Sequence, residues 1–325
     1  MKLPRRRFLH LAAGAAAFPA VSRIARAQAY PTRPVRVIVG FAPGGAPDIV
    51  ARLLGPTLSE RLGQSVYVEN RTGAGSNIAT EAVVNAEPDG YTLLLVSPPN
   101  FVNAALYEKL NYNFIRDIAP VAALIRVPNV MEVNPAVPAK SVPEFVAYAK
   151  ANPDKLNMAS GGIGTSVHMA GELFKMMTGV RMPHVPYRGV GAANPDLLAG
   201  QVQVMFDSTP GSIEFIRSRR LRALGLAALM RSPVLPDLPT IAEFVPGYES
   251  SALHGVGAPR NTPPEIINKL NSTINAILSD PVVKARFDSM GATLITSSPA
   301  AFGTYVAQET EKWAKVVKFS GAKPD

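Results

Sequence analysis

The chain has 325 residues, 47% of them hydrophobic, no cysteine, and a formal net charge of +9. This length and apolar content allow a well-buried protein of two domains. The lack of cysteine excludes disulfides, thiolate catalysis and cysteine-based zinc sites. Six of the 33 basic residues and none of the 24 acidic ones lie in the first 29 positions, so the remainder carries only +3. We therefore expect no nucleic-acid partner.

Residues 1–29 have the pattern of a cleavable export signal. A basic start is followed by an apolar stretch over 9–18 and by the small-residue cleavage site Ala27-Gln28-Ala29. Arg5-Arg6-Arg7-Phe8-Leu9 resembles the twin-arginine pattern, although Pro4 replaces the usual Ser or Thr, which leaves the Sec route open. The apolar stretch is too short to span a bilayer, and no later one is longer. We expect a mature protein that starts near Tyr30, does not span the membrane and lies in the periplasm.

The first structural unit is a strand, a glycine loop and a helix. The run 35–39 is apolar and rich in β-branched residues, and Pro and Gly over 41–47 forbid regular structure. Apolar residues then recur at helical spacing until Gly63. Asp48 stands where an N-cap is expected, and in that interpretation it is purely structural. In the other interpretation the loop is one wall of a small-anion site at the helix N-terminus.

The nucleotide-binding versions of such a loop are absent. No Lys-Ser or Lys-Thr follows Gly44-Gly45, so the phosphate loop of nucleotide hydrolases is excluded. Two further glycine pairs, Gly73/Gly75 and Gly162/Gly164, lack the third glycine of the dinucleotide fingerprint. We expect no nucleotide and no cofactor.

The rest of the chain repeats strand, glycine-rich loop and helix. Strands are predicted at 66–68, 91–96, 156–159, 184–189, 202–206 and 221–226. Helices are predicted at 78–86, from 141, at 167–177, from 264 and from 299, and an irregular tip at 97–100. This alternation predicts an α/β fold whose mainly parallel sheet binds ligands beyond the carboxyl ends of its strands.

Many short motifs resemble the tripartite tricarboxylate transporter solute receptors, also called TctC-type or Bug-type periplasmic binding proteins. They follow the same order over nearly all of the mature chain. They are Tyr30-Pro-x-Arg-Pro, Phe41-x-Pro-Gly-Gly-x-x-Asp48, Glu69-Asn-Arg-x-Gly-Ala-Gly, Pro88-Asp-Gly-Tyr-Thr, Gly164-Thr-Ser-x-His168, Val185-Pro-Tyr-x-Gly, Gly200-Gln-Val-x-x-Met-Phe-Asp207, Arg231-Ser-Pro-x-Leu-Pro-Asp-x-Pro-Thr240 and Trp313-x-Lys-Val-Val.

The resemblance implies a two-lobed periplasmic binding protein of type II, with one lobe at 30–129 plus 253–325 and the other at 130–252. It implies a monomeric receptor that closes on a small carboxylate, such as a di- or tricarboxylate, an acidic amino acid or an aromatic acid. A membrane permease of the tripartite tricarboxylate type is the implied partner. A sensor that presents its ligand to a membrane signalling protein has the same sequence features.

Carried over by position, nine residues are candidates for ligand binding: Gly44, Gly45, Asp48 and Ser97 in the first lobe, and Thr165, Ser166, His168, Tyr187 and Asp207 in the second. We expect the amides of Gly44-Gly45 and Gly164-Thr165-Ser166 to donate to carboxylate oxygens, together with the two hydroxyls. Tyr187 offers an apolar wall with a polar tip. Asp207 can accept from a donor and repels a second carboxylate.

Two departures from the family pattern bear on the ligand. Ser97-Pro98-Pro99-Asn100 replaces a tip rich in Gly, Ser and Thr, which makes that wall stiffer. Leu253-His254 stands where a Trp and an apolar or aromatic residue are common, which widens the expected cleft.

Metal binding and catalysis find little support. No pair among His168, His184 and His254 has metal-ligand spacing, so we expect no metal and favour a structural or capping role for His168. The basic run over 217–222 is interpreted as a solvated helix end. An exported hydrolase remains the less favoured alternative, because no Gly-x-Ser-x-Gly elbow occurs, although a triad can assemble in space.

Overall fold

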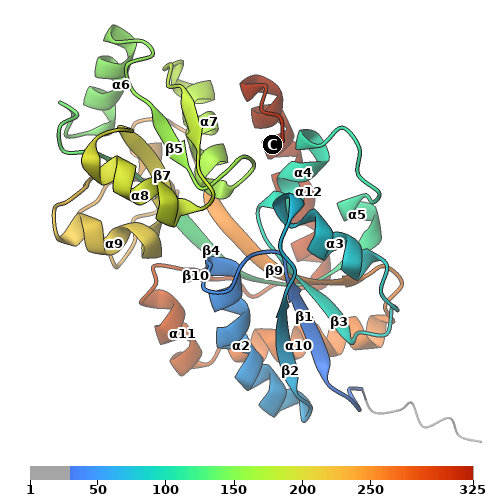
Figure 1. The fold of residues 1–325 in the computed structure, drawn as a ribbon. Coiled ribbons are helices and arrows are strands. Elements are labelled where there is room, and N and C mark those ends of the chain that lie inside the picture. Colours follow the sequence, from blue (N-terminus) through green and yellow to red (C-terminus); the bar gives the residue numbers. More distant parts are fainter. Residues whose placement is uncertain (1–29, 325) are drawn as a thin grey trace, which may run out of the picture.

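The computed structural model describes residues 30–324 of the chain, and the expected export signal lies outside these residues. The described chain forms two α/β lobes that share one ten-stranded sheet (Figure 1). The strand order is β2-β1-β3-β9-β4-β7-β5-β6, and β8 and β10 also pair with β4. The predicted α/β, two-lobed fold is therefore confirmed.

Lobe 1 begins with the predicted strand–loop–helix units. Strand β1 (Val35–Val39) pairs in parallel with β2 (Val66–Asn70) and β3 (Thr92–Val96). Helix α2 (Ala46–Leu62) ends at Gly63, whose φ of 69° is the left-handed conformation that glycine adopts readily. The short 3₁₀ helix η1 (Ala74–Ser76) precedes α3 (Asn77–Val84).

The predicted irregular tip after β3 is wrong, because a helix starts there. Helix α4 (Pro99–Leu106) begins two residues after Ser97. The Asn100 Oδ1 atom accepts the Ser97 amide at 2.8 Å, which closes the turn. Proline at the first helical position is compatible with a helix, since its missing N–H would have no partner there.

The lobes are joined by two long antiparallel strands. Strand β4 (Ile118–Val133), which the sequence analysis missed, pairs with β9 (Ser251–Pro259) through Pro128 and with β7 from Asn129 onward. Pro128 lies opposite Ser251, the first residue of β9. Both connections between the lobes therefore cross at the same level of the sheet.

Lobe 2 is built on the parallel strands β5 (Met158–Ser160), β6 (His184–Pro186) and β7 (Val204–Ser208), with β8 (Arg222–Leu226) antiparallel to β4. Its helices are α6 (Val142–Ala151), α7 (Ser166–Thr178), α8 (Val190–Ala199) and α9 (Thr209–Arg217). The turn η2 (Ile241–Glu243) precedes the return to β9.

The remaining elements are α5 (Phe114–Asp117), α10 (Pro264–Leu278), α11 (Pro281–Asp288), β10 (Thr293–Leu294) and α12 (Pro299–Ser320). Helix α12 packs against both α4 of lobe 1 and α7 of lobe 2. Its residues Phe302, Trp313 and Val317 belong to a buried cluster that also contains Val102 and Phe174, from the two lobes. The last helix thus contacts both lobes. No helix within residues 30–324 combines the length and the apolar character needed to cross a bilayer.

Candidate functional site: the cleft between the lobes

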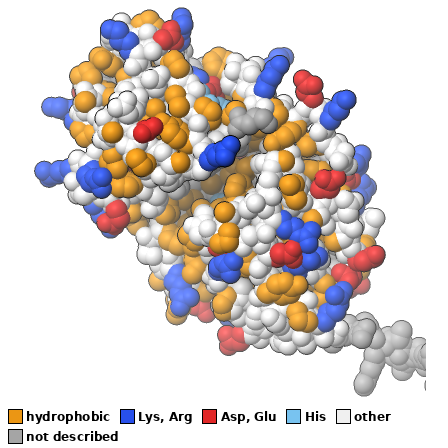
Figure 2. Space-filling model, viewed as in Figure 1, with side chains coloured by type: hydrophobic (Ala, Val, Ile, Leu, Met, Phe, Trp, Pro, Cys, Tyr) orange, Lys and Arg blue, Asp and Glu red, His pale blue; other side chains and the backbone are white. Residues whose placement is uncertain are grey.

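The strand ends of both lobes lead into helix starts at the junction of the lobes. Strands β1 and β3 of lobe 1 precede α2 and α4, and strands β5, β6 and β7 of lobe 2 precede α7, α8 and α9. Figure 2 shows a hollow between the two lobes on this face of the molecule. The carboxyl edge of an α/β sheet is the usual position for a ligand.

Besides the packing of α12 against α7, the lobes contact each other where β5 and β7 end. A Cβ atom on Gly164 would lie 2.8 Å from Leu106 Cδ2, so the 160–166 loop of lobe 2 contacts α4 of lobe 1. A Cβ atom on Gly291 would lie 2.8 Å from Thr209 Cγ2, so the turn after α11 contacts the start of α9. The loop after β5 and the start of α9 in lobe 2 therefore both contact lobe 1 in this structure.

Asp48 organises the loop between β1 and α2. Its carboxylate accepts the Gly44 amide at 2.9 Å, Arg52 Nε at 2.9 Å and Asn70 Nδ2 at 2.8 Å. Burial alone would raise the pKa of the Asp48 carboxyl, but the bonds from Arg52, Gly44 and Asn70 together hold it below its ordinary value. This carboxylate is 2% exposed and fully engaged by the protein.

The expected N-cap role of Asp48 is wrong. Gly45, with φ −73° and ψ 160°, occupies the N-cap, and Asp48 is the third residue of α2. The helix starts three residues earlier than expected because Pro47 is readily accommodated in the first turn. The acid acts instead as an acceptor for the loop in front of the helix.

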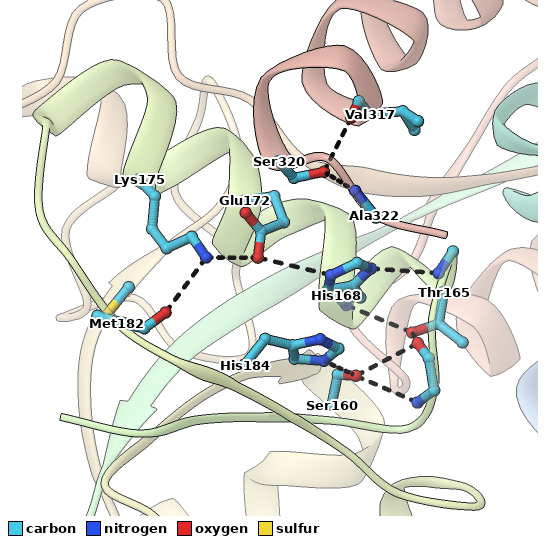
Figure 3. Close-up of polar contacts among 12 residues, drawn as sticks. Ser160, Thr165, His168, Glu172, Lys175, Met182, His184, Val317, Ser320 and Ala322 are labelled. Atoms are coloured by element: carbon cyan, nitrogen blue, oxygen red, sulfur yellow. Dashed lines mark hydrogen bonds and ion pairs between the residues drawn. The ribbon is translucent and has the colours of Figure 1, made fainter. Parts of the chain in front are cut away.

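His168 organises the corresponding loop between β5 and α7 (Figure 3). Its Nδ1 atom accepts the Gly164 amide at 3.2 Å, and the N-cap Thr165 accepts the His168 amide at 3.3 Å. Because Nδ1 accepts, the proton of the neutral ring lies on Nε2, which is 3.5 Å from Glu172 Oε1. These contacts agree with the structural role expected for His168, whereas the N-cap itself is Thr165, and His168 is 2% exposed.

A second imidazole stacks on the first. The rings of His168 and His184 lie 3.9 Å apart with an interplanar angle of 21°. His184 Nε2 is 2.6 Å from Ser160 Oγ, and Lys175 Nζ is 2.6 Å from Glu172 Oε1, as Figure 3 shows. Burial is the main cause that lowers the pKa of His184 to about 3, and the nearby His168 is the second. The His184 ring is therefore neutral at physiological pH.

These contacts change which amides face a ligand. The Gly44, Gly45, Gly164 and Thr165 amides all donate within the protein, so in this structure they are engaged and not free for a carboxylate. Within residues 30–324 the first-turn amides without a partner include Ala46 in α2 and Ser166 and Val167 in α7. The half-buried Ser166 hydroxyl also makes no hydrogen bond in this part of the chain.

Ser97 and Tyr187 are less available than the sequence suggests. Ser97 is 1% exposed, and its amide and hydroxyl both contact Asn100 Oδ1, at 2.8 and 3.3 Å. The Tyr187 hydroxyl donates to Asp196 Oδ2 at 2.6 Å, which raises the pKa of Tyr187 to about 12. The Tyr187 ring is half-buried and can still form an apolar wall.

Asp207 lies under the first turn of α9 with an unexpected neighbour, Glu132 of β4. Asp207 Oδ1 accepts the Ser208 amide at 2.6 Å, but Asp207 Oδ2 and both Glu132 carboxyl oxygens have no partner in the described chain. Burial, together with the Asp207 charge, raises the pKa of Glu132, and burial raises that of Asp207 to about 6. Glu132 was missed, although an acid inside the apolar run 127–133 was a usable signal.

The basic run at the end of α9 lies apart from the strand ends. A surface cavity of about 600 Å³ is lined by Arg217, Arg219 and Arg222. Arg222 donates to the carbonyls of Pro135, Val137 and Ala139, so it is a structural residue. No cluster of three potential metal ligands occurs among the described residues.

Several solved structures share this fold and sequence. The Rpa4515 protein of R. palustris with adipate is 37% identical, with a TM-score of 0.83, and the match covers 91% of this chain and 100% of that one. MatC from Rhodopseudomonas palustris with bound malate is 35% identical, with a TM-score of 0.78, over 89% of this chain and 100% of that one.

Sequence comparison finds relatives of the same kind as the structural comparison. The BugT protein of Bordetella pertussis is 39% identical over 300 residues, covering 91% of this chain and 92% of BugT. The family model described as the tripartite tricarboxylate transporter family receptor matches residues 15–321. The proteins of this family are substrate-binding receptors, and solved relatives are described as periplasmic. The chain therefore belongs to the TctC family of tripartite tricarboxylate transporter receptors.

Proposed function

We propose that the protein captures a small carboxylate between its lobes and delivers it to a membrane permease of the tripartite tricarboxylate type. The observation that carries this proposal is the pair of helix starts, α2 and α7, that open onto the cleft with free amides. Helix N-termini favour anions through their free N–H groups and dipole. Relatives that bind adipate and malate support the same ligand class.

Lobe closure is the proposed mechanism. The ligand contacts Ala46 from lobe 1 and Ser166 and Val167 from lobe 2, and these contacts shift an open–closed equilibrium about the crossings of β4 and β9. The moving units are 30–129 plus 253–325 and 130–252, with α12 sliding over α7. No reacting group is required, so the protein is a receptor and not an enzyme.

The proposed location and partners follow from the same role. The receptor acts in the periplasm as a monomer that starts near Tyr30 after its export signal is removed. The permease recognises the closed form, since only that form presents both lobes in one fixed arrangement.

A thermal-shift screen of purified mature protein with mono-, di- and tricarboxylates, aromatic acids and acidic amino acids tests the proposal. A ligand at a hundred times its Kd stabilises the fold by about 2.7 kcal/mol. We expect Ser166→Ala to weaken a hit roughly fivefold or more, and Ser272→Ala, on the exposed face of α10, to leave it unchanged. If no carboxylate binds and mass spectrometry after unfolding finds no retained ligand, the proposal is wrong.

A further inference from the structure

His254 lies at the level of the cleft, where the strands of lobe 1 end. Strands β3 and β9 pair Leu94 with Gly257, Leu95 with Val256 and Val96 with Gly255. The next position in this register places His254 beside Ser97, the first residue beyond β3. His254 is also three residues from Ser251, where the chain crosses between the lobes.

The His254 ring is buried without a hydrogen bond. Its residue is 2% exposed, and neither ring nitrogen has a partner of ordinary length and angle in the described chain. Buried polar atoms almost always have partners, and exceptions often mark a site that a ligand or water completes. Burial lowers the pKa of His254 to about 4, so the ring is neutral and offers one donor and one acceptor.

The surroundings determine which nitrogen is the donor. The Val96 carbonyl faces the ring and favours its protonated form. A carbonyl can only accept, so the N–H of the neutral ring is directed toward Val96. The other neighbours on this face, Ala252, Ile125 and Val256, are apolar. The second nitrogen is therefore left as a buried lone-pair acceptor without a partner among the described residues, at the level where β3 ends.

An acceptor at this position repels a carboxylate oxygen and favours a donor. We propose that His254 is a specificity residue that accepts a hydrogen bond from a donor substituent, a hydroxyl or an ammonium group, on the bound carboxylate. The inference rests on the proposed function, because the carboxylate itself binds at the helix starts. It names the subclass of ligand: hydroxy acids or amino acids rather than unsubstituted acids.

Matched ligands test the inference by isothermal titration. Succinate, malate and aspartate differ only in a hydrogen, hydroxyl or amino substituent, as do propionate, lactate and alanine. We expect the donor-bearing member of a binding series to bind at least tenfold more tightly than the unsubstituted acid. Comparison of the hydroxy acid with the amino acid in each series shows whether a hydroxyl or an ammonium group is the preferred donor.

His254→Phe keeps a ring but removes the acceptor. We expect it to weaken the donor-bearing ligand about tenfold and to change the unsubstituted acid by less than about threefold. His254→Asn or His254→Gln retains an amide oxygen and restores part of the preference. Leu253→Met, on the opposite face of β9, is the matched control and leaves the ratio unchanged.

The outcomes separate this inference from the proposed function. If carboxylates bind but the wild-type protein shows no preference for the donor-bearing member, or His254→Phe preserves the preference, the inference is overturned and the receptor function stands. If no carboxylate binds, both fail. In the NMR spectrum, the acceptor nitrogen of His254 should shift with the donor-bearing acid and not with the unsubstituted one.

Discussion

The glycine loops before α2 and α7 have the same backbone construction in the two lobes. Gly44 and Gly164 have φ of 84° and 77°, and the N-caps Gly45 and Thr165 both have ψ of 160°. In each loop the third helical residue, Asp48 or His168, accepts the amide of that glycine. Each of these residues also faces a side chain four positions later, Arg52 or Glu172.

The residue that accepts the glycine amide differs in chemistry between the two loops. Lobe 1 uses a carboxylate whose lowered pKa keeps it charged over the physiological range. Lobe 2 uses an imidazole that accepts through a neutral nitrogen and stacks on a second imidazole. The same loop geometry is therefore held by a carboxylate in one lobe and by an imidazole in the other.

Removing the Asp48 carboxylate, which holds the lobe 1 loop, should have the largest effect on stability. Asp48→Ala leaves the Gly44 amide, Asn70 and Arg52 without their acceptor, and we expect a loss of about 3 kcal/mol in the free energy of unfolding. Urea denaturation measures it. Asp288→Ala removes an exposed pair of the same spacing, with Lys284, and should cost at most about 0.5 kcal/mol. Equal losses in the two variants would contradict the role of Asp48 in holding the loop.

In the lobe 2 loop, a smaller hydrogen-bond acceptor should substitute for His168. His168→Ala removes the acceptor of the Gly164 amide and leaves a void, and we expect a loss of about 2 kcal/mol with weaker ligand binding. His168→Asn keeps an oxygen near the position of Nδ1 and should retain most of the affinity. If titration calorimetry finds the same affinity for both variants, the Gly164 contact does not shape the site.

Acid should destabilise the fold through His184. The pKa of His184 falls from 6.5 in the unfolded chain to about 3 in the fold, so its stabilising contribution is complete above pH 6.5 and is lost as the pH falls toward 3. The slope for one such group is at most about 1.4 kcal/mol per pH unit. His184→Gln should flatten the pH dependence of stability between pH 6.5 and 4. An unchanged slope would mean that other groups, such as His254, dominate it.

The buried acids should give a smaller effect of opposite sign. The raised pKa of Glu132 means that its deprotonation opposes folding, so stability is lost as the pH rises. Glu132→Gln should stabilise the protein by about 1 kcal/mol at pH 8 and leave it unchanged near pH 4. Chemical denaturation at the two pH values measures this difference. A less stable variant at pH 8 would show that the Glu132 charge is compensated.

Local sequence signals predicted much of the secondary structure. The β-branched strand at 35–39, the helix end at Gly63 and the start of the last helix at Pro299 each form as expected, because they depend on neighbours a few residues away. The crossing strand β4 was missed, since its apolar residues lack a clear period where it passes from one lobe to the other. The irregular tip at 97–100 was wrong because Asn100 closes a turn that starts a helix.

The candidate site also combines features that the sequence determined with features that only the tertiary structure decided. The sequence by itself determined the family, the glycine loops and the helices that follow them, because these are encoded in short motifs and backbone preferences. Only the tertiary structure decided which groups remain for a ligand. The Gly44 and Gly164 amides donate to Asp48 and His168, whereas Glu132 and His254 are brought to buried positions without partners among residues 30–324. Hydrogen-bond partners and burial depend on packing between distant segments, which residue type and spacing alone do not specify.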